Sequence, residues 1–288
     1  MALTAKAQKP HRESIIARAL GISSLRLGLF FLIILLIAAL FAPVITGLDP
    51  KALGSAVLAS PGGQHPLGTD QFGRDLFTRI LYGARTSLTI GFLAAGISGV
   101  IGIVIGAISG YFGGKVDQAL SFFISIFDMT PMFFLILIVI ALFGGSILNV
   151  VIVIGLTTWT ANARLMRAQT VSLRDRVFVQ AAVTVGEGKW RILLRHVVPN
   201  GIYPLVVNTT ANISAAILME ASLSFIGLGD PNIISWGQIV LDGRSQIVGA
   251  WWISTFGGLA IVLTAWTFFL LGDGLNRLIT PKLHTLGR

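Results

Sequence analysis

The sequence lacks cysteine and carries little charge, and each absence excludes a class of chemistry. Without cysteine the chain has no disulfide, no thiolate metal ligand and no cysteine nucleophile. Its four histidines are scattered along the sequence and follow no metal-ligand spacing. Only 11% of the residues are charged, whereas soluble domains carry about 25%. We therefore expect no metal site, and no soluble globular domain.

The sequence is rich in long apolar runs, and 54% of the 288 residues are hydrophobic. A helix needs about 20 apolar residues to cross a hydrocarbon core, and six runs are long enough. These runs are apolar on all sides and do not alternate, which excludes a β-barrel. The pattern predicts an all-α polytopic membrane protein with six transmembrane helices, at residues 27–45, 88–110, 119–143, 146–166, 200–225 and 250–271.

The first run follows a basic segment, residues 1–26, and resembles a signal peptide only superficially. It is too long for a signal-peptide core, and no small-residue cleavage site follows it. We therefore expect residues 27–45 to remain in the protein as its first transmembrane helix.

Lysine and arginine are distributed unevenly among the segments that connect the runs. Five precede the first run and seven lie between Arg164 and Arg195, whereas the alternate segments together hold only five. The positive-inside rule then places both termini in the cytoplasm. Residues 46–87 become an outside loop, residues 167–199 an inside loop and residues 276–288 a cytoplasmic tail. The net charge of +9 follows this asymmetry, so we expect contact with membrane lipid and not with nucleic acid.

The inside loop combines a short helix of small residues, a glycine and a basic amphipathic segment that ends at Pro199. Ala181 and Ala182 would let another backbone approach closely, and Gly186 permits a sharp turn. Such a helix could sit in the groove of a cytoplasmic partner. It could equally lie on anionic lipid.

The outside loop predicts an amphipathic helix that lies across the outer mouth as a lid. Thr69 or Asp70 can cap its start, and Asp75 and Arg79 are spaced to pair on one face. With Arg74, the two aspartates are the candidate lid residues. We favour a role in packing the spans together over direct substrate contact. The opposite face is apolar and consists of Leu76, Phe77, Ile80 and Leu81.

Polar residues inside the runs are few. A charge at mid-bilayer costs about 2.5–3.5 kcal/mol, so such groups usually face a cavity or a partner. The alternative is interhelical hydrogen bonding that holds the bundle together. Pro131 predicts a kink in the third run. The candidate residues of a translocation path are Asp128, Asn208, Asn212 and Glu220.

Gly102, Gly106 and Gly110 are four residues apart in the second run. This spacing places them on one face of a helix, where small residues allow two helices to pack closely. We expect them to serve packing and not transport.

The inside loop resembles the EAA loop of ABC importer permeases. Ala181, Ala182, Gly186 and Pro199 match the pattern in register, and Gln180 stands where the pattern has Glu. The resemblance implies that these five residues belong to a coupling helix that inserts into an ATPase subunit.

A second resemblance, to the second membrane subunit of dipeptide, oligopeptide and nickel permeases, extends from His65 to nearly the end of the chain. It implies the type I ABC importer permease fold in a bacterial inner membrane, with a permease domain at residues 85–275. It also implies passage of di- or oligopeptides, with nickel complexes and glutathione-like compounds as alternatives. The matching segments are residues 65–88, 107–117, 219–229, 236–237, 272–275 and 281–283.

The same resemblance implies three kinds of partner: a second, homologous permease subunit in a heterodimer, two ATP-binding subunits and an extracytoplasmic solute-binding protein. A phosphate-binding loop requires Gly-Lys followed by Ser or Thr, but Lys115 precedes Val116 and Lys189 precedes Trp190. We expect no enzymatic activity and no cofactor on this chain, with ATP-Mg on the partner subunits.

Two functions of other classes are the alternatives. An ion-coupled secondary transporter would need clustered carboxylates and cations in its spans, and none is present in the sequence. A membrane enzyme would need a nucleophile–base pair or a metal set at one interface, and no such set is visible.

Overall fold

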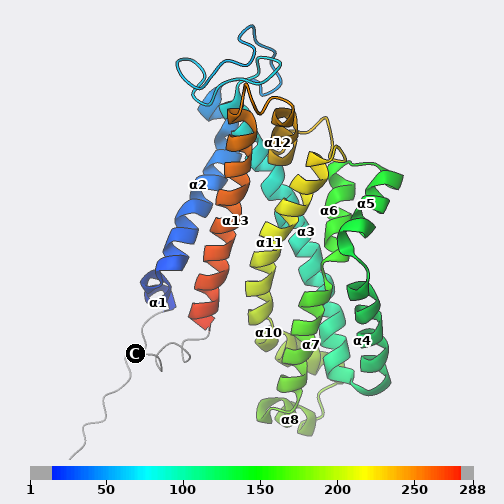
Figure 1. Ribbon diagram of the computed structural model, residues 1–288. Helices are drawn as coiled ribbons and strands as arrows, with labels where there is room; N and C mark the ends of the chain where they lie inside the picture. The colour runs from blue at the N-terminus through cyan, green and yellow to red at the C-terminus, as the bar shows by residue number, and fades with distance from the viewer. Residues whose placement is uncertain (1–14, 280–288) are drawn as a thin grey trace, which may run out of the picture.

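The structure, a computed structural model, describes residues 15–279, and all the named elements of secondary structure in that range are helices (Figure 1). The predicted basic residues before Ile15 and the motif at residues 281–283 lie outside the described residues. The helices are α1 (Ile15–Gly21), α2 (Ser23–Thr46), α3 (Leu76–Phe112), α4 (Gly114–Met129), α5 (Met132–Phe143), α6 (Ile147–Thr157), α7 (Thr160–Arg174), α8 (Val177–Thr184), α9 (Lys189–Ile192), the π-helix η1 (Leu193–Val197), α10 (Val198–Gly201), α11 (Tyr203–Phe225), α12 (Trp236–Arg244) and α13 (Trp252–Ile279).

Four of these stretches are long and apolar enough to cross a membrane alone: α2, α3, the α6–α7 segment Ile147–Arg174, and α13. Two bent pairs qualify only when each is taken as one span. The first joins α4 to α5 with a bend of 79°, and the second joins Lys189–Gly201 to α11 with a bend of 61°. The resulting six spans fall on the six predicted apolar runs, so the predicted all-α membrane fold is confirmed.

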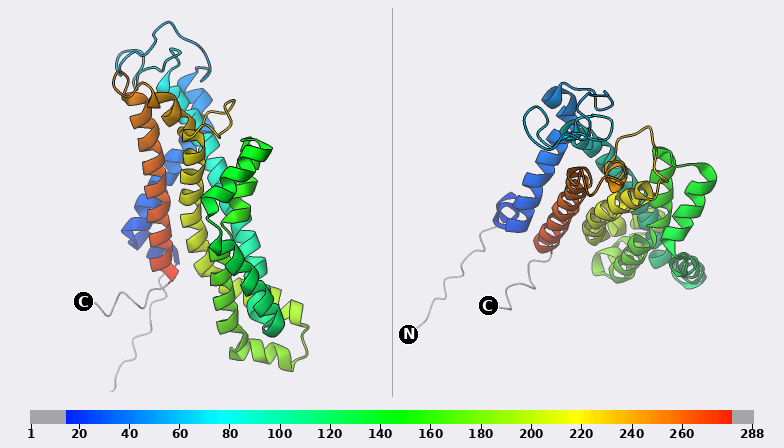
Figure 2. Two further views of the ribbon diagram at one scale, coloured as in Figure 1. Left: turned by 45° about the vertical axis from the view of Figure 1, so that its right-hand side comes forward. Right: turned by 45° about the horizontal axis from the view of Figure 1, so that its top comes forward.

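The two ends of the bundle differ. The loop at residues 47–75 and α12 lie at one end, which we call the α12 end, and α8 lies at the opposite end, the α8 end (Figure 1). α2 and α13 pack side by side on one flank, α3 and α11 occupy the middle, and α4 to α7 form the other flank (Figure 2).

The predicted kink in the third run lies at Thr130 and Pro131, between α4 and α5. Proline has no N–H to donate to the preceding turn, and its ring clashes with that turn, so a helix bends or ends there. The prediction of a kink at Pro131 is confirmed.

The predicted glycine face of α3 packs directly against α7. A Cβ on Gly106 would lie 2.2 Å from the carbonyl oxygen of Ala163, and one on Gly102 would lie 2.3 Å from Cβ of Asn162. A Cβ on Gly110 would lie 2.7 Å from the carbonyl oxygen of Arg167. The packing role predicted for these glycines is confirmed.

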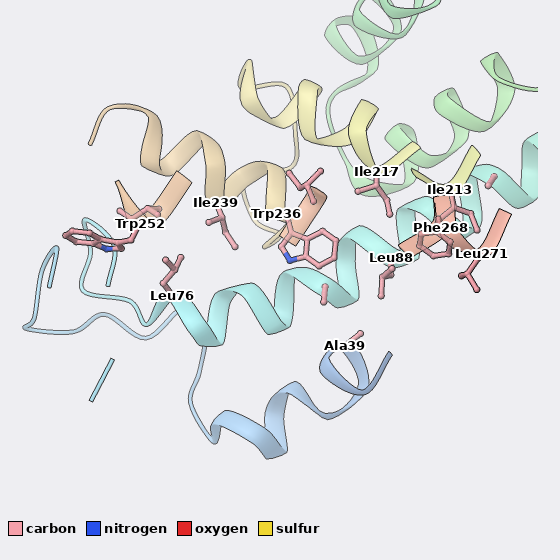
Figure 3. Packing of buried hydrophobic residues seen from close by; sticks show 14 of the residues in the cluster. Ala39, Leu76, Leu88, Ile213, Ile217, Trp236, Ile239, Trp252, Phe268 and Leu271 are labelled. Atoms are coloured by element: carbon pink, nitrogen blue, oxygen red, sulfur yellow. The ribbon is translucent and has the colours of Figure 1, made fainter. Parts of the chain in front are cut away.

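The largest hydrophobic cluster among the described residues joins α2 and α13 to α3, α11 and α12 (Figure 3). Trp236 of α12 is almost fully buried in it. Its indole Nε1 donates to the carbonyl oxygen of Ile80 at 3.0 Å, and its backbone N donates to Oγ of Ser87 at 3.2 Å. These bonds fix α12 onto the first turns of α3.

The lid helix that we predicted is not a separate element. Asp75 caps a helix that begins at Leu76, its carboxylate accepting a bond from the backbone N of Thr78 at 2.8 Å, and this helix continues unbroken to Phe112. Leu76 is fully buried, so burial of the apolar face directs the segment along the bundle and not across it. Thr69 and Asp70, which we expected to cap a helix, lie in the preceding loop.

Candidate functional site

At the α8 end, α7 is followed by a tight turn and then by α8. Gln180 donates from its side-chain Nε2 to the carbonyl oxygen of Arg174 at 3.0 Å, which ties α8 to the end of α7. Gly186 follows α8 with φ of +87°, a conformation that favours glycine, as the predicted sharp turn requires. Pro199 does not end the amphipathic segment as we expected, because the helix continues to Gly201 before it bends into α11.

Most of α8 is exposed, and several of its exposed residues are apolar. Val177 and Val185, at its two ends, are 86% and 84% exposed. Ala182 instead packs inward, against the cluster that contains Val179 and Val197. The two alanines of the predicted coupling motif therefore face different ways. We call the exposed residues of this segment the α8 surface: Val177, Phe178, Gln180, Ala181, Val183, Thr184 and Val185.

Three contacts fix the segments that precede and follow α8. Nε2 of His196 lies 3.0 Å from Oε2 of Glu187, which closes the turn at Gly186. Trp190 packs on Phe112, with 5.0 Å between ring centroids. Nη1 of Arg174 donates to the carbonyl oxygen of Gly110 at 3.1 Å. The α8 surface is thus fixed relative to α3 and α9.

At the α12 end, two aspartates and two arginines form a closed cluster. Asp70 is fully buried, and its Oδ2 accepts bonds from Nη1 of Arg79 and, at 2.6 Å, from Nε of Arg74. Asp242 of α12 accepts from Nη2 of Arg79 at 2.7 Å and from Nη2 of Arg74 at 3.2 Å. Two positive and two negative charges share this site, which joins the loop, α3 and α12.

The ion pair that we predicted between Asp75 and Arg79 is absent. Asp75 lies beside His65 instead, with 2.9 Å between Oδ2 and Nδ1, while Arg79 is held by Asp70 and Asp242. The predicted lid residues are therefore occupied by bonds within the protein, which favours the packing role that we preferred for them. We did not predict Asp242 as a member of this cluster, because the sequence around it does not indicate that its partners are Arg74 and Arg79.

Asn208 joins a chain of hydrogen bonds that crosses three helices. Its Nδ2 donates to Oδ1 of Asn162 at 2.9 Å, and Nδ2 of Asn162 donates to Oγ of Ser98 at 3.3 Å. The Ser98 hydroxyl donates to the carbonyl oxygen of Thr158 at 2.9 Å. This network fits the alternative in which polar residues hold the bundle together. Asn162 and Ser98 were not among our candidates, although both stand out as polar residues in apolar runs.

Glu220 is buried near the α12 end of α11. Its Oε1 accepts bonds from the hydroxyls of Ser224 and Ser235, each at 2.7 Å, while its Oε2 has no partner among the described residues. A cavity of about 10 Å³, bordered also by Thr86, adjoins the carboxylate. Asn212 is partly buried, and its Nδ2 likewise lacks a partner within the described chain.

Asp128 lies at the other flank, where it pairs with Arg164. A second pair follows along α7, in which Nε and Nη2 of Arg167 each donate to Asp117 at 2.6 Å. Both arginines border a cavity of about 420 Å³ between α4 and α7, which Ser121 and Ser125 also line. The two arginines and Asp117 were missed as site residues, because we assigned the arginines to the inside loop and its boundary.

The four candidate path residues do not form one site. Asp128 reaches the α4–α7 cavity through Arg164, whereas Asn208 is in the interhelical network and Glu220 borders a separate small cavity. Within residues 15–279, no group of three or more His, Asp or Glu side chains could hold a metal ion.

Three comparisons relate the chain to known proteins. It is 39% identical over 266 residues to a putative peptide transport system permease protein of Brucella suis, covering 92% of this chain and 90% of that one. It is 37% identical over 254 residues to a probable D,D-dipeptide transport system permease protein of Escherichia coli, with 87% and 85% covered. The predicted resemblance to peptide-transport permeases is thereby confirmed.

A solved structure of the MetNI methionine ABC transporter in an inward-facing conformation shares the fold. Its TM-score is 0.57 at 16% identity, over 69% of this chain and 96% of that chain. Residues 102–285 match the family model described as binding-protein-dependent transport system inner membrane component. The chain belongs to this family of inner-membrane permease components of ABC importers.

Proposed function

We propose that this chain forms half of a path that carries di- or oligopeptides into a bacterial cell, and that separate subunits supply the ATP hydrolysis. The observation that carries the proposal is the α8 surface, which is exposed, partly apolar and projects beyond the spans (Figure 1). The peptide class is supported by the printed names of the relatives from Brucella suis and Escherichia coli.

The α8 surface would dock in a groove of an ATP-binding subunit. The α6–α7 segment has 28 residues, or about 42 Å of helix, whereas the hydrocarbon core is about 30 Å thick. α8 follows this segment and therefore fits better in water than in lipid. Val177 and Val185 are apolar and exposed there, which is expected of a surface that a protein partner covers. Gln180, Ala181 and Thr184 lie on the same surface.

The α8 end then faces the cytoplasm and the α12 end faces the solute-binding protein, with both termini inside, as the positive-inside rule predicts. A second permease subunit would complete the path, in a heterodimer. ATP-Mg would bind only to the ATP-binding partners, and this chain would have no catalytic activity of its own.

Within this chain, the α4–α7 cavity is the best-supported part of the path. Its serines and paired arginines offer hydrogen bonds to peptide groups, and Asp128 balances Arg164 beside it. Asn208 and Glu220 would hold α11 against its neighbours, and Asn212 would add its free amide to the polar face of α11. The permease domain would occupy residues 85–275, with α2 added outside it.

Reconstitution tests the proposal. Proteoliposomes would contain this chain, the partner permease and the two ATP-binding subunits, with peptide-loaded binding protein added outside. We expect peptide uptake and ATP hydrolysis that depend on all components, and no hydrolysis by this chain alone. Hydrolysis by the purified chain, or uptake driven by an ion gradient without ATP, would contradict the proposal.

A further inference from the structure

A groove of about 630 Å³ lies at the α12 end, between the end of α2 and the side of α3. Pro43 and residues 47–51 form one wall, and Tyr82, Arg85 and Thr86 of α3 form another. The loop at residues 232–234 closes the third side. Nothing in the proposed transport mechanism uses this groove.

The groove lies at the level where the apolar parts of two helices end. α2 has no charged residue between Arg26 and Asp49, and α3 has none between Arg85 and Lys115. The first charged residues of both segments at this end, Asp49 and Arg85, line the groove together with Lys51. The boundary between hydrocarbon and headgroups is where long cationic side chains and tyrosines are favoured in membrane proteins.

The groove offers hydrogen-bond donors and a positive charge. Nζ of Lys51 donates one bond, at 2.9 Å, to the carbonyl oxygen of Asn232, which leaves two of its three protons free. The guanidinium of Arg85 is exposed and makes no ion pair or hydrogen bond within residues 15–279, and neither does the hydroxyl of Tyr82. Asp49 is the acidic residue of the lining, and its carboxylate accepts a hydrogen bond from the backbone N of Lys51. Free donors around two cations match an anion with several acceptor oxygens, such as a phosphate.

Exposed apolar surface continues from the groove toward the middle of both helices. Leu40, one turn below Pro43 on α2, is 68% exposed, and Leu93, two turns below Arg85 on α3, is 53% exposed. A ligand that places a phosphate between Lys51 and Arg85 could therefore lay hydrocarbon chains along these faces.

We propose that this groove binds an anionic glycerophospholipid of the outer leaflet, with its phosphate held by Lys51, Arg85 and Tyr82. The phosphate accepts the free donors, and the acyl chains lie against α2 and α3. The choice of the outer leaflet rests on the proposed orientation. The groove shares no residue with the α4–α7 cavity or the α8 surface, so lipid binding can be tested without peptide transport.

Native mass spectrometry of the full-length chain in detergent, titrated with phosphatidylglycerol, tests the site. We expect the double variant Lys51→Gln/Arg85→Gln to bind this lipid about tenfold more weakly, from the loss of charge-assisted hydrogen bonds. The control Arg244→Gln removes a charge from the same end outside the groove and should bind as the wild type does. Unchanged thermal unfolding would show that each variant is folded.

A second arm separates lipid from free phosphate. Excess inorganic phosphate should not displace phosphatidylglycerol, because it lacks the acyl chains. Equal lipid affinity of the double variant and the wild type would overturn the proposal, as would displacement by inorganic phosphate alone. It would also be overturned if the double variant kept lipid binding but lost assembly with the partner permease, since the groove would then be a subunit contact.

Discussion

Gly106 lies at the closest approach of α3 and α7, and the consequence of a single added carbon there is large. A Cβ at this position would meet the carbonyl oxygen of Ala163 at 2.2 Å, against a backbone that cannot move aside without separating the two helices. Small residues at such contacts let van der Waals packing act between helices in a membrane, where the hydrophobic effect contributes little.

We predict that Gly106→Ala destabilises the protein by at least about 1–3 kcal/mol, the usual cost of overpacking. The matched control is Gly96→Ala on the same helix, where an added Cβ has no neighbour within 4 Å. That variant should unfold at or slightly above the wild-type temperature. Thermal unfolding of both variants in detergent checks this, and equal midpoints would contradict the packing role.

The arginine and aspartate cluster illustrates burial of charge. Arg79 is 1% exposed and bonds to both Asp70 and Asp242, so its removal leaves two carboxylates with only Arg74 between them. We predict that Arg79→Gln costs about 3–5 kcal/mol, as breaking a buried pair does. Arg244→Gln, which changes an exposed arginine of α12, should cost much less. The thermal unfolding midpoints of the two variants test this prediction. If Arg79→Gln unfolds at the wild-type temperature, the cluster does not stabilise the loop.

At the scale of elements, much of the fold follows from the sequence. The six apolar runs correctly predicted six spans, and Pro131 correctly predicted the bend between α4 and α5, because both signals are local in the sequence. The break before α11 lies close to Pro199, where the sequence predicted the inside segment to end. The course of the segment after Leu76 depends on tertiary packing, and the sequence pattern did not predict it. Arg79 and Asp242 are 163 positions apart, so no spacing rule could have paired them.

The α8 element was predicted well in outline and less well in detail. A small-residue helix followed by a turn at Gly186 is a local pattern, and the structure contains it. Which alanine faces outward depends on how α8 packs against α7 and α9, and the sequence does not contain that information. Ala181 is exposed, whereas Ala182 contacts the hydrophobic cluster below α8.

This difference yields a paired prediction. Ala181→Trp should leave expression and thermal unfolding unchanged but prevent an ATP-binding subunit from co-purifying, because bulk is added to the docking surface. Ala182→Trp should lower the unfolding temperature, since overpacking costs about 1–3 kcal/mol. If Ala181→Trp co-purifies normally and transports peptide at the wild-type rate, the α8 surface is not the docking site.

At the scale of the whole molecule, the two ends of the bundle differ in structure. The α12 end is closed by the loop, the buried charge cluster and Trp236, whereas the α8 end presents a small exposed helix on a rigid base. Such an arrangement suits a permease subunit that receives substrate at the α12 end and contacts an ATP-binding subunit at the α8 end. Its orientation rests on the distribution of lysine and arginine.

The absence of native cysteine allows the most direct test of this account. A single cysteine at the exposed Ala181 would be crosslinked in the assembled transporter, and one at the exposed Gln64 of the opposite end is its matched control. We predict that Ala181→Cys crosslinks to an ATP-binding subunit and never to the solute-binding protein, and that Gln64→Cys is labelled only from outside the cell. Crosslinking of Ala181→Cys to the solute-binding protein, or no crosslink in an actively transporting complex, would contradict the account.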